Sequence, residues 1–293
     1  MPSLKDVKVK IAGVKKTKQI TKAMNMVASA KLRGAQQRIE RFRPYASKFY
    51  DMLGDLASKA DSSVHPLLEV REEIKTCGIV LATSDRGLCG SFNSNLITTA
   101  LKLAAKKAAE GKKVKFYCVG KKGRDAARKT DHEVAMALAD QMGSFDFQLA
   151  NRIGLEVINA YLTRELDEVI MVYGEFVSMA KQLPIALPIL PIAPKEEEAA
   201  PAAPASNKEY IYEPAVEGLL AELLPRFIKV QLYRGLLDTS ASEHAARMAA
   251  MDNATRSCDD MIGSLTLLFN KTRQASITRD LMDIVGGAEA LKG

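Results

Sequence analysis

The sequence of 293 residues has no tryptophan, 6% aromatic residues, four cysteines and three histidines. The cysteines are scattered without a Cys-x-x-Cys pair, and the histidines fall at no ligand spacing, so we expect neither a metal nor a cofactor. Free thiols suit a reducing compartment. The longest apolar stretch, Leu183–Ala193, is short and contains three prolines, so we expect no transmembrane helix. Residues 1–30 are too charged for a secretory signal.

Two long tracts at opposite ends of the chain each carry an apolar seam with heptad spacing. The first runs through Leu4, Val7, Ile11, Val14, Lys18, Thr21, Asn25, Ala28, Leu32, Ala35, Ile39, Phe42, Ala46, Phe49, Leu53 and Leu56. The second runs through Leu220, Leu223, Phe227, Val230, Arg234, Leu237, Ala241, His244, Met248, Met251, Thr255, Cys258, Ile262, Leu265 and Phe269. A repeat of 3.5 residues over this length predicts a coiled coil.

The segment between the tracts sets the geometry of the coiled coil. A compact inserted domain brings its two ends together, so the helices that enter and leave it should be antiparallel. A helix from Leu4 to Leu56 spans roughly 80 Å, and one from Pro214 to Ile284 roughly 105 Å. We therefore expect the C-terminal helix to extend past its partner. Pro44 should bend the first helix.

The middle segment alternates between strand and helix patterns. The predicted strands are Cys77–Thr83, Lys113–Val119 and Asp167–Tyr173, with a continuation of the last through Phe176–Leu183 left open. The predicted helices are Asn93–Ala109, a short one within Lys121–Lys129, and Phe145–Leu162. This order predicts an α/β fold with a small parallel-sheet, Rossmann-like domain. The expected divisions are a rod helix (1–59), the α/β domain (60–193), a mobile Pro/Ala/Glu loop (194–209) and a second rod helix (210–293).

Positive charge is concentrated in the first helix. Residues 1–59 contain 14 Lys and Arg against four acids, whereas the rest of the chain is close to balanced. A basic helix can face nucleic acid, an anionic membrane or an acidic protein. Because no nucleic-acid motif or interleaved aromatic residues accompany it, we expect a solvated face or an acidic protein partner, and no nucleic acid.

The middle domain lacks the residues of an active site. Gly87 and Gly90, in the loop after the first strand, form neither a dinucleotide fingerprint nor a P-loop. Asp85 and Arg86 lie in the same loop without a nucleophile or base, and His244 falls on the seam. We expect no catalysis. A nucleotide-binding enzyme remains as a third class, which titration with ATP or NAD would test.

Three blocks together resemble one family. They are ITKAMNMVASAKLRGAQ (20–36), SDRGLCGSFN (84–93) and the C-terminal pair SEHAARMAAMDN (242–253) and NKTRQASITRDLMDIVGGAEA (270–290). In this order they are similar to the γ subunit of F-type ATP synthases, in its bacterial form. Asp280 departs from the family, which has Glu there. The resemblance implies a non-catalytic rotor shaft that couples proton or sodium-ion flow to ATP synthesis and hydrolysis.

The same resemblance implies partners and contact residues. The partners would be three α and three β subunits, the ε subunit and the membrane c-ring, and the location would be peripheral, on the cytoplasmic face of the bacterial inner membrane. Contacts with the β subunit and coupling would involve Lys22, Met24, Arg273, Gln274, Thr278, Asp280 and Asp283. The foot that meets the ring and ε would contain Tyr210 and Glu213. The alternative is a stand-alone coiled-coil adaptor that binds polyanions through its basic first helix.

Overall fold

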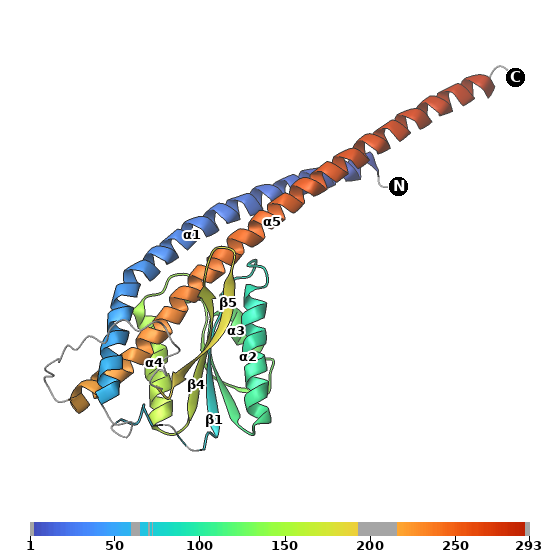
Figure 1. Ribbon diagram of the computed structural model, residues 1–293. Coiled ribbons are helices and arrows are strands. Elements are labelled where there is room, and N and C mark those ends of the chain that lie inside the picture. Colours follow the sequence, from blue (N-terminus) through green and yellow to red (C-terminus); the bar gives the residue numbers. More distant parts are fainter. Residues whose placement is uncertain (1–2, 60–64, 70, 72, 193–215, 291–293) are drawn as a thin grey trace. The chain divides into compact units, whose positions relative to one another are not determined.

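The computed structural model describes residues 3–59, 65–69, 71, 73–192 and 216–290. The elements in chain order, shown in Figure 1, are α1 (Leu4–Lys59), β1 (Thr76–Ala82), α2 (Phe92–Ala109), β2 (Lys113–Val119), α3 (Lys121–Ala127), β3 (Glu133–Leu138), α4 (Phe147–Leu162), β4 (Glu168–Phe176), β5 (Gln182–Leu190) and α5 (Val216–Ala290). The chain divides into two compact units. We call Met1–Ser29 with Arg247–Gly293 the helix-pair unit, and Ala30–Ala246 the sheet unit.

The sheet unit contains one five-stranded sheet with the order β3-β2-β1-β4-β5. The pairs β3–β2, β2–β1 and β1–β4 are parallel, and Val80 at the centre of β1 is opposite Tyr117 and Met171. The central strands are apolar because both of their faces are covered. The predicted α/β fold with a parallel sheet is confirmed for these strands.

Two edge strands depart from the prediction. The third predicted strand does not continue through Phe176–Leu183, because β4 ends at Phe176 and the chain reverses into β5, which is antiparallel to β4. Pro184 and Pro188 lie within β5. Proline cannot donate to a strand ladder, but an edge strand has one side without a neighbour. Strand β3, on the opposite edge, was not predicted.

Helices cover both faces of the sheet. On one face, Leu96, Ala100 and Ala104 of α2 pack against Ile79 and Phe116. On the other face lie α4 and the first part of α5, as Figure 1 shows. The sheet unit therefore has three layers, with an apolar core on each side of the sheet.

Within the sheet unit, α5 carries a second apolar stripe, which shares only Leu220 with the predicted heptad seam. Leu220, Leu224, Ile228, Leu232 and Leu236 repeat every four residues and are fully buried in the core on the α4 side. Close packing on the strands depends on a glycine next to this stripe. A β-carbon at Gly235 would lie 2.6 Å from the terminal methyl group of Met171. Helix α5 thus packs against the sheet on one side and against α1 on another.

Aromatic contacts confirm the antiparallel pairing of α1 and α5 inside the sheet unit. The rings of Phe42 and Tyr233 meet edge to face at 4.9 Å, and those of Phe49 and Phe227 stack at 6.4 Å. The residue number rises along α1 as it falls along α5, as an antiparallel pair requires. Pro44 lies inside α1, and the helix continues through it. The expected bend there stays a prediction.

Arg71, in the segment before β1, forms hydrogen bonds with the end of α4 and the loop that leads into β4. The Arg71 guanidinium donates to the carbonyl oxygens of Leu166 (2.7 Å) and Tyr161 (2.6 Å) and to the Asp167 carboxylate (2.5 Å). Asp167 also accepts the N–H of Thr76 at 2.9 Å. Burial acts to raise the pKa of Asp167, but these hydrogen bonds outweigh it and hold the pKa below its ordinary value.

Candidate functional site

The helix-pair unit consists of two antiparallel helical segments joined along the predicted seam. Every seam residue of α1 from Leu4 to Ala28 is buried or half-buried, as is every seam residue of α5 from Met248 to Phe269. Most side chains between these positions are exposed. The heptad pattern is therefore confirmed in this unit, and it places the remaining side chains on an outer surface.

The three polar residues that interrupt the α1 seam all contact α5. Lys18 forms an ion pair with Asp259, the Thr21 and Thr255 hydroxyls are 2.8 Å apart, and the Asn25 amide donates to the Met248 carbonyl oxygen at 2.9 Å. A polar group in a coiled-coil seam fixes the register at some cost in stability. We call these contacts the polar layer. The sequence indicated the interruption but not Asp259, which lies beside the predicted seam.

The start of α1 is capped by its own sequence. The Asp6 N–H donates to the Ser3 hydroxyl, and the Ser3 N–H donates to the Asp6 carboxylate, both at 3.2 Å. This reciprocal pair is a capping box. The hydrogen bond from the Ser3 side chain lowers the pKa of Asp6. The charge at this end of α1 therefore includes an ionised carboxylate among several lysines.

The end of α5 extends beyond the seam. Ser276 is the last half-buried residue, and the described side chains from Ile277 onward are all exposed. Among them, Leu281 is 57% exposed, Met282 65% and Ile284 72%. Within this unit the C-terminal helix therefore extends past its partner, as expected. An apolar surface of this kind is typical of a part that another protein covers.

The predicted contact residues lie at two separate levels. On α1, Lys22 is exposed and Met24 is half-buried. Continuing the register of the Lys18–Asp259 pair places Lys22 opposite residues near 255. Arg273, Gln274, Thr278, Asp280 and Asp283 are all exposed on α5. Asp280 lies about 25 residues further along this helix, or roughly 40 Å. The structure does not bring the two groups together, and Tyr210 and Glu213 lie outside the described residues.

The loop after β1, which carries one of the three resembling blocks, is engaged in holding the sheet unit together. The Asp85 carboxylate accepts the backbone N–H groups of Lys121 (2.9 Å), Asp140 (2.8 Å) and Met142 (2.8 Å), joining the loops that follow three strands. The Asn93 amide donates to the Ser84 hydroxyl at 2.7 Å. The Asp85 carboxylate and the Asn93 amide are thus used in hydrogen bonds that hold the sheet unit together, which gives these residues of the block a structural role.

Three of the four cysteines noted in the sequence are buried in the core of the sheet unit. Burial raises the pKa of the Cys77 and Cys118 thiols to about 12, so neither is a thiolate at neutral pH. Among the described residues, no cluster of three His, Cys, Asp or Glu side chains could hold a metal ion. In the same part of the chain, no helix combines the length and hydrophobicity that a bilayer crossing needs.

Comparison with known proteins gives consistent results. A family model described as ATP synthase matches residues 3–291. The ATP synthase gamma chain of Nitratidesulfovibrio vulgaris strain Miyazaki F is 99% identical over 293 residues, which is 100% of both chains. The ATP synthase gamma chain of Lawsonia intracellularis is 58% identical over 292 residues, again 100% of both chains.

Two solved structures are also similar. The central stalk and c-ring structure of the Tetrahymena thermophila mitochondrial ATP synthase contains a chain with a TM-score of 0.59 and 26% identity, covering 80% of this chain and 99% of that one. A chain of the Euglena gracilis mitochondrial ATP synthase, in an OSCP/F1/c-ring structure, has a TM-score of 0.65 and 21% identity and covers 98% and 94%. The latter likeness concerns the fold alone.

Proposed function

This chain belongs to the ATP synthase gamma chain family, and we propose that its helix-pair unit is the part of the central rotor shaft that acts on the catalytic ring. The chain itself is a non-catalytic subunit. The observation that carries this proposal is the antiparallel helix pair with its polar layer and the single exposed helix beyond it. As such a shaft turns, each subunit around it meets a different side of the shaft.

The seam gives the shaft its stiffness and its register. Two helices packed along apolar heptads resist bending and twisting better than one, because each side chain of the seam is held by the facing helix. The polar layer opposes sliding of one helix along the other, since a shift would separate Thr21 and Asn25 from their partly buried hydrogen-bond partners on α5. Rotation at one end can then be transmitted to the other without a change of register.

Coupling in such a machine is an interaction free energy between distant sites. The shaft changes the ATP sites by making different contacts with the α and β subunits that surround it, three of each. We assign Arg273 and Gln274, which are exposed on α5, to contacts with β. Thr278, Asp280 and Asp283 belong to the same contact level on α5, and Lys22 and Met24 form the second level, on α1. Asp280 has a shorter reach than the Glu of the family.

The apolar end of α5 is suited to a bearing. Ile277, Leu281 and Ile284 expose hydrocarbon rather than hydrogen-bonding groups. Apolar contacts are non-directional, so a surrounding sleeve can hold this helix at many angles with similar free energy. Such a contact lets the shaft turn while it stays centred.

We also propose a foot on the segment that precedes α5 in the chain. We assign Tyr210 and Glu213, outside the described residues, to contacts with the c-ring and the ε subunit. The division into two rod helices, an α/β domain and the loop 194–209, which lies outside the described residues, belongs to the same proposal. As part of the F1 sector, the chain is attached to the membrane, and we place it on the cytoplasmic face of the bacterial inner membrane as a peripheral protein.

The first test is a tagged pull-down from detergent-solubilised membranes, with mass spectrometry and an ATPase assay of the eluate. We expect α, β and ε subunits together with ATPase activity. Recovery of the chain alone, or with nucleic acid, would contradict the proposal. The alternative of a stand-alone polyanion-binding adaptor has no support among the comparisons.

A further inference from the structure

The outer face of α4 carries two large apolar side chains that are close to half-exposed. Leu155 is 46% exposed and Leu162 45%, whereas Leu149, Ile153 and Val157 on the inner face are buried. Phe147 lies at the edge of this face, and its ring contacts that of Tyr233 on α5 at 5.5 Å. Leu155 and Leu162 are one heptad apart, so they lie within roughly 20° of each other around the helix. We call Leu155 and Leu162 the α4 stripe.

Helix α2, which also packs on the sheet, carries no such stripe. Helix α2 covers the other face of the same sheet and leaves no large apolar side chain exposed along its described length. Its outward positions include Asn95, Lys102 and Lys106. Two helices with the same structural task thus differ in the face that they present to the surroundings. This contrast points to a contact made by α4.

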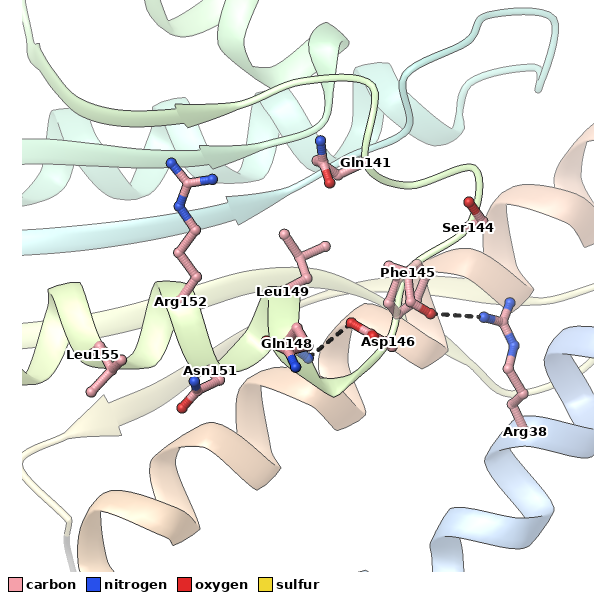
Figure 2. A pocket seen from close by; sticks show the side chains of 10 residues that line it. All are labelled: Arg38, Gln141, Ser144, Phe145, Asp146, Gln148, Leu149, Asn151, Arg152 and Leu155. Carbon is pink, nitrogen blue, oxygen red and sulfur yellow. Dashed lines mark hydrogen bonds between the residues drawn. The ribbon is translucent and has the colours of Figure 1, made fainter.

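A groove of about 670 Å³ adjoins the stripe, and Figure 2 shows the side chains that line it. Its floor is α4 itself, through Gln148, Asn151, Arg152 and Leu155. Arg38 of α1 stands at one end. Its guanidinium donates to the Phe145 carbonyl oxygen at 3.3 Å and lies 5.2 Å from the centre of the Phe145 ring. Arg38 is therefore held in place before anything binds.

The polar lining of the groove favours an anionic partner. Arg38 and Arg152 are its cations, and Asp146 is its one carboxylate. That carboxylate is occupied, because it accepts the Gln148 N–H at 2.9 Å and caps α4. Among the described residues, Arg152 forms no hydrogen bond or ion pair. Arginine guanidinium groups in a groove with carboxamides are well suited to carboxylates.

We propose that the outer face of α4 binds an amphipathic helix of another subunit, which lays apolar side chains on the α4 stripe and presents carboxylates to Arg152 and Arg38. This inference rests on the proposed function, since the partner is a subunit of the assembled synthase. The heptad spacing of Leu155 and Leu162 matches the side-chain period of a packed helix. Ligand pockets usually bury 70–90% of a small molecule, whereas this groove is largely open to solvent.

The test places a photo-crosslinking amino acid, p-benzoylphenylalanine, at position 155 in the purified, assembled enzyme. A second enzyme carries it at position 162. Because Glu156 is also exposed but lies about 100° away around α4, substitution there is the matched control. We expect adducts from positions 155 and 162 to one acidic, amphipathic helical segment of another subunit, identified by peptide mass spectrometry. The yield from position 156 should be at least about fivefold lower.

A charge reversal tests the electrostatic part. Arg152→Glu should lower the adduct yield at position 155 about fivefold, as expected when a weak attraction becomes a repulsion, and Arg152→Lys should keep most of it. Absence of adducts, equal yields from 155 and 156, or an adduct between two copies of this chain would overturn the inference. Failure of the chain to assemble with α and β subunits would instead contradict the proposed function.

Discussion

Asp238 is a buried carboxylate whose removal should stabilise the protein. It lies on α5 inside the sheet unit and is 9% exposed. Burial raises its pKa to about 6, and the Glu175 carboxylate on β4 acts in the same direction, while Arg234 and Arg43 partly oppose them. At neutral pH Asp238 is therefore mostly ionised, although burial makes its charged form less stable in the folded protein than in the unfolded chain.

The size of the effect follows from the pKa. A folded-state value of about 6, against an ordinary value of 3.8, corresponds to about 3 kcal/mol at neutral pH. Because the folded state binds this proton more tightly than the unfolded state, the cost is absent below about pH 4, grows between pH 4 and 6 and is complete above pH 6. Asp238→Asn removes the charge with little change in volume, so it should stabilise the chain by up to about 3 kcal/mol at pH 7.5.

The assay is urea unfolding of the full-length chain, followed by circular dichroism at several pH values between 4 and 8. The free energy of unfolding of the Asn variant should exceed that of the unsubstituted chain at pH 7.5, and the gain should disappear near pH 4. Asp260→Asn, at an exposed position of the same helix, is the control and should give no such trend. A gain that does not change with pH, or a loss at pH 7.5, would refute the reasoning.

Three further predictions concern other parts of the chain. Asp167→Asn should lower the free energy of unfolding by about 3 kcal/mol at pH 7, because it leaves the partly buried Arg71 without its charged partner. Urea unfolding measures this loss. The difference between the two proteins should shrink at acidic pH, where Asp167 of the unsubstituted chain becomes protonated. Gly120→Ala should destabilise the chain by several kcal/mol, because φ is +95° and a β-carbon would lie 2.1 Å from a backbone oxygen. Gly143→Ala, where no atom lies within 4 Å, should have little effect on the thermal midpoint. Met24→Lys adds a charge beside the polar layer, and should lower the number of ions pumped per ATP hydrolysed while α and β subunits still assemble. Unchanged ion pumping would count against the assigned role.

Much of the architecture follows from local pattern. The heptads fixed which side of α1 is buried from Leu4 to Phe49, because the seam of a coiled coil is a property of spacing along one chain. The three central strands were recognisable since a parallel strand covered on both faces must be apolar throughout. The polar interruption at Lys18, Thr21 and Asn25 was visible for the same reason, as a departure from a regular period.

The two edge strands were harder to predict from the sequence, because their pairing depends on strands that are far away in the chain. Strand β5 contains two prolines, which argue against a strand in a local reading, and only its place at the edge of the sheet makes them acceptable. Strand β3 alternates between exposed and half-buried residues over a short length, a weak local signal.

By itself, the sequence determined the two long helices, their antiparallel pairing, the parallel centre of the sheet and the family resemblance, since each rests on a periodic or contiguous pattern. Only the tertiary structure decided that α5 has a second buried stripe, that Asp259 pairs with Lys18, and that the outer face of α4 adjoins a groove lined by Arg38. It also decided the state of Asp238, because a carboxylate on a helix becomes buried only when another element packs over it.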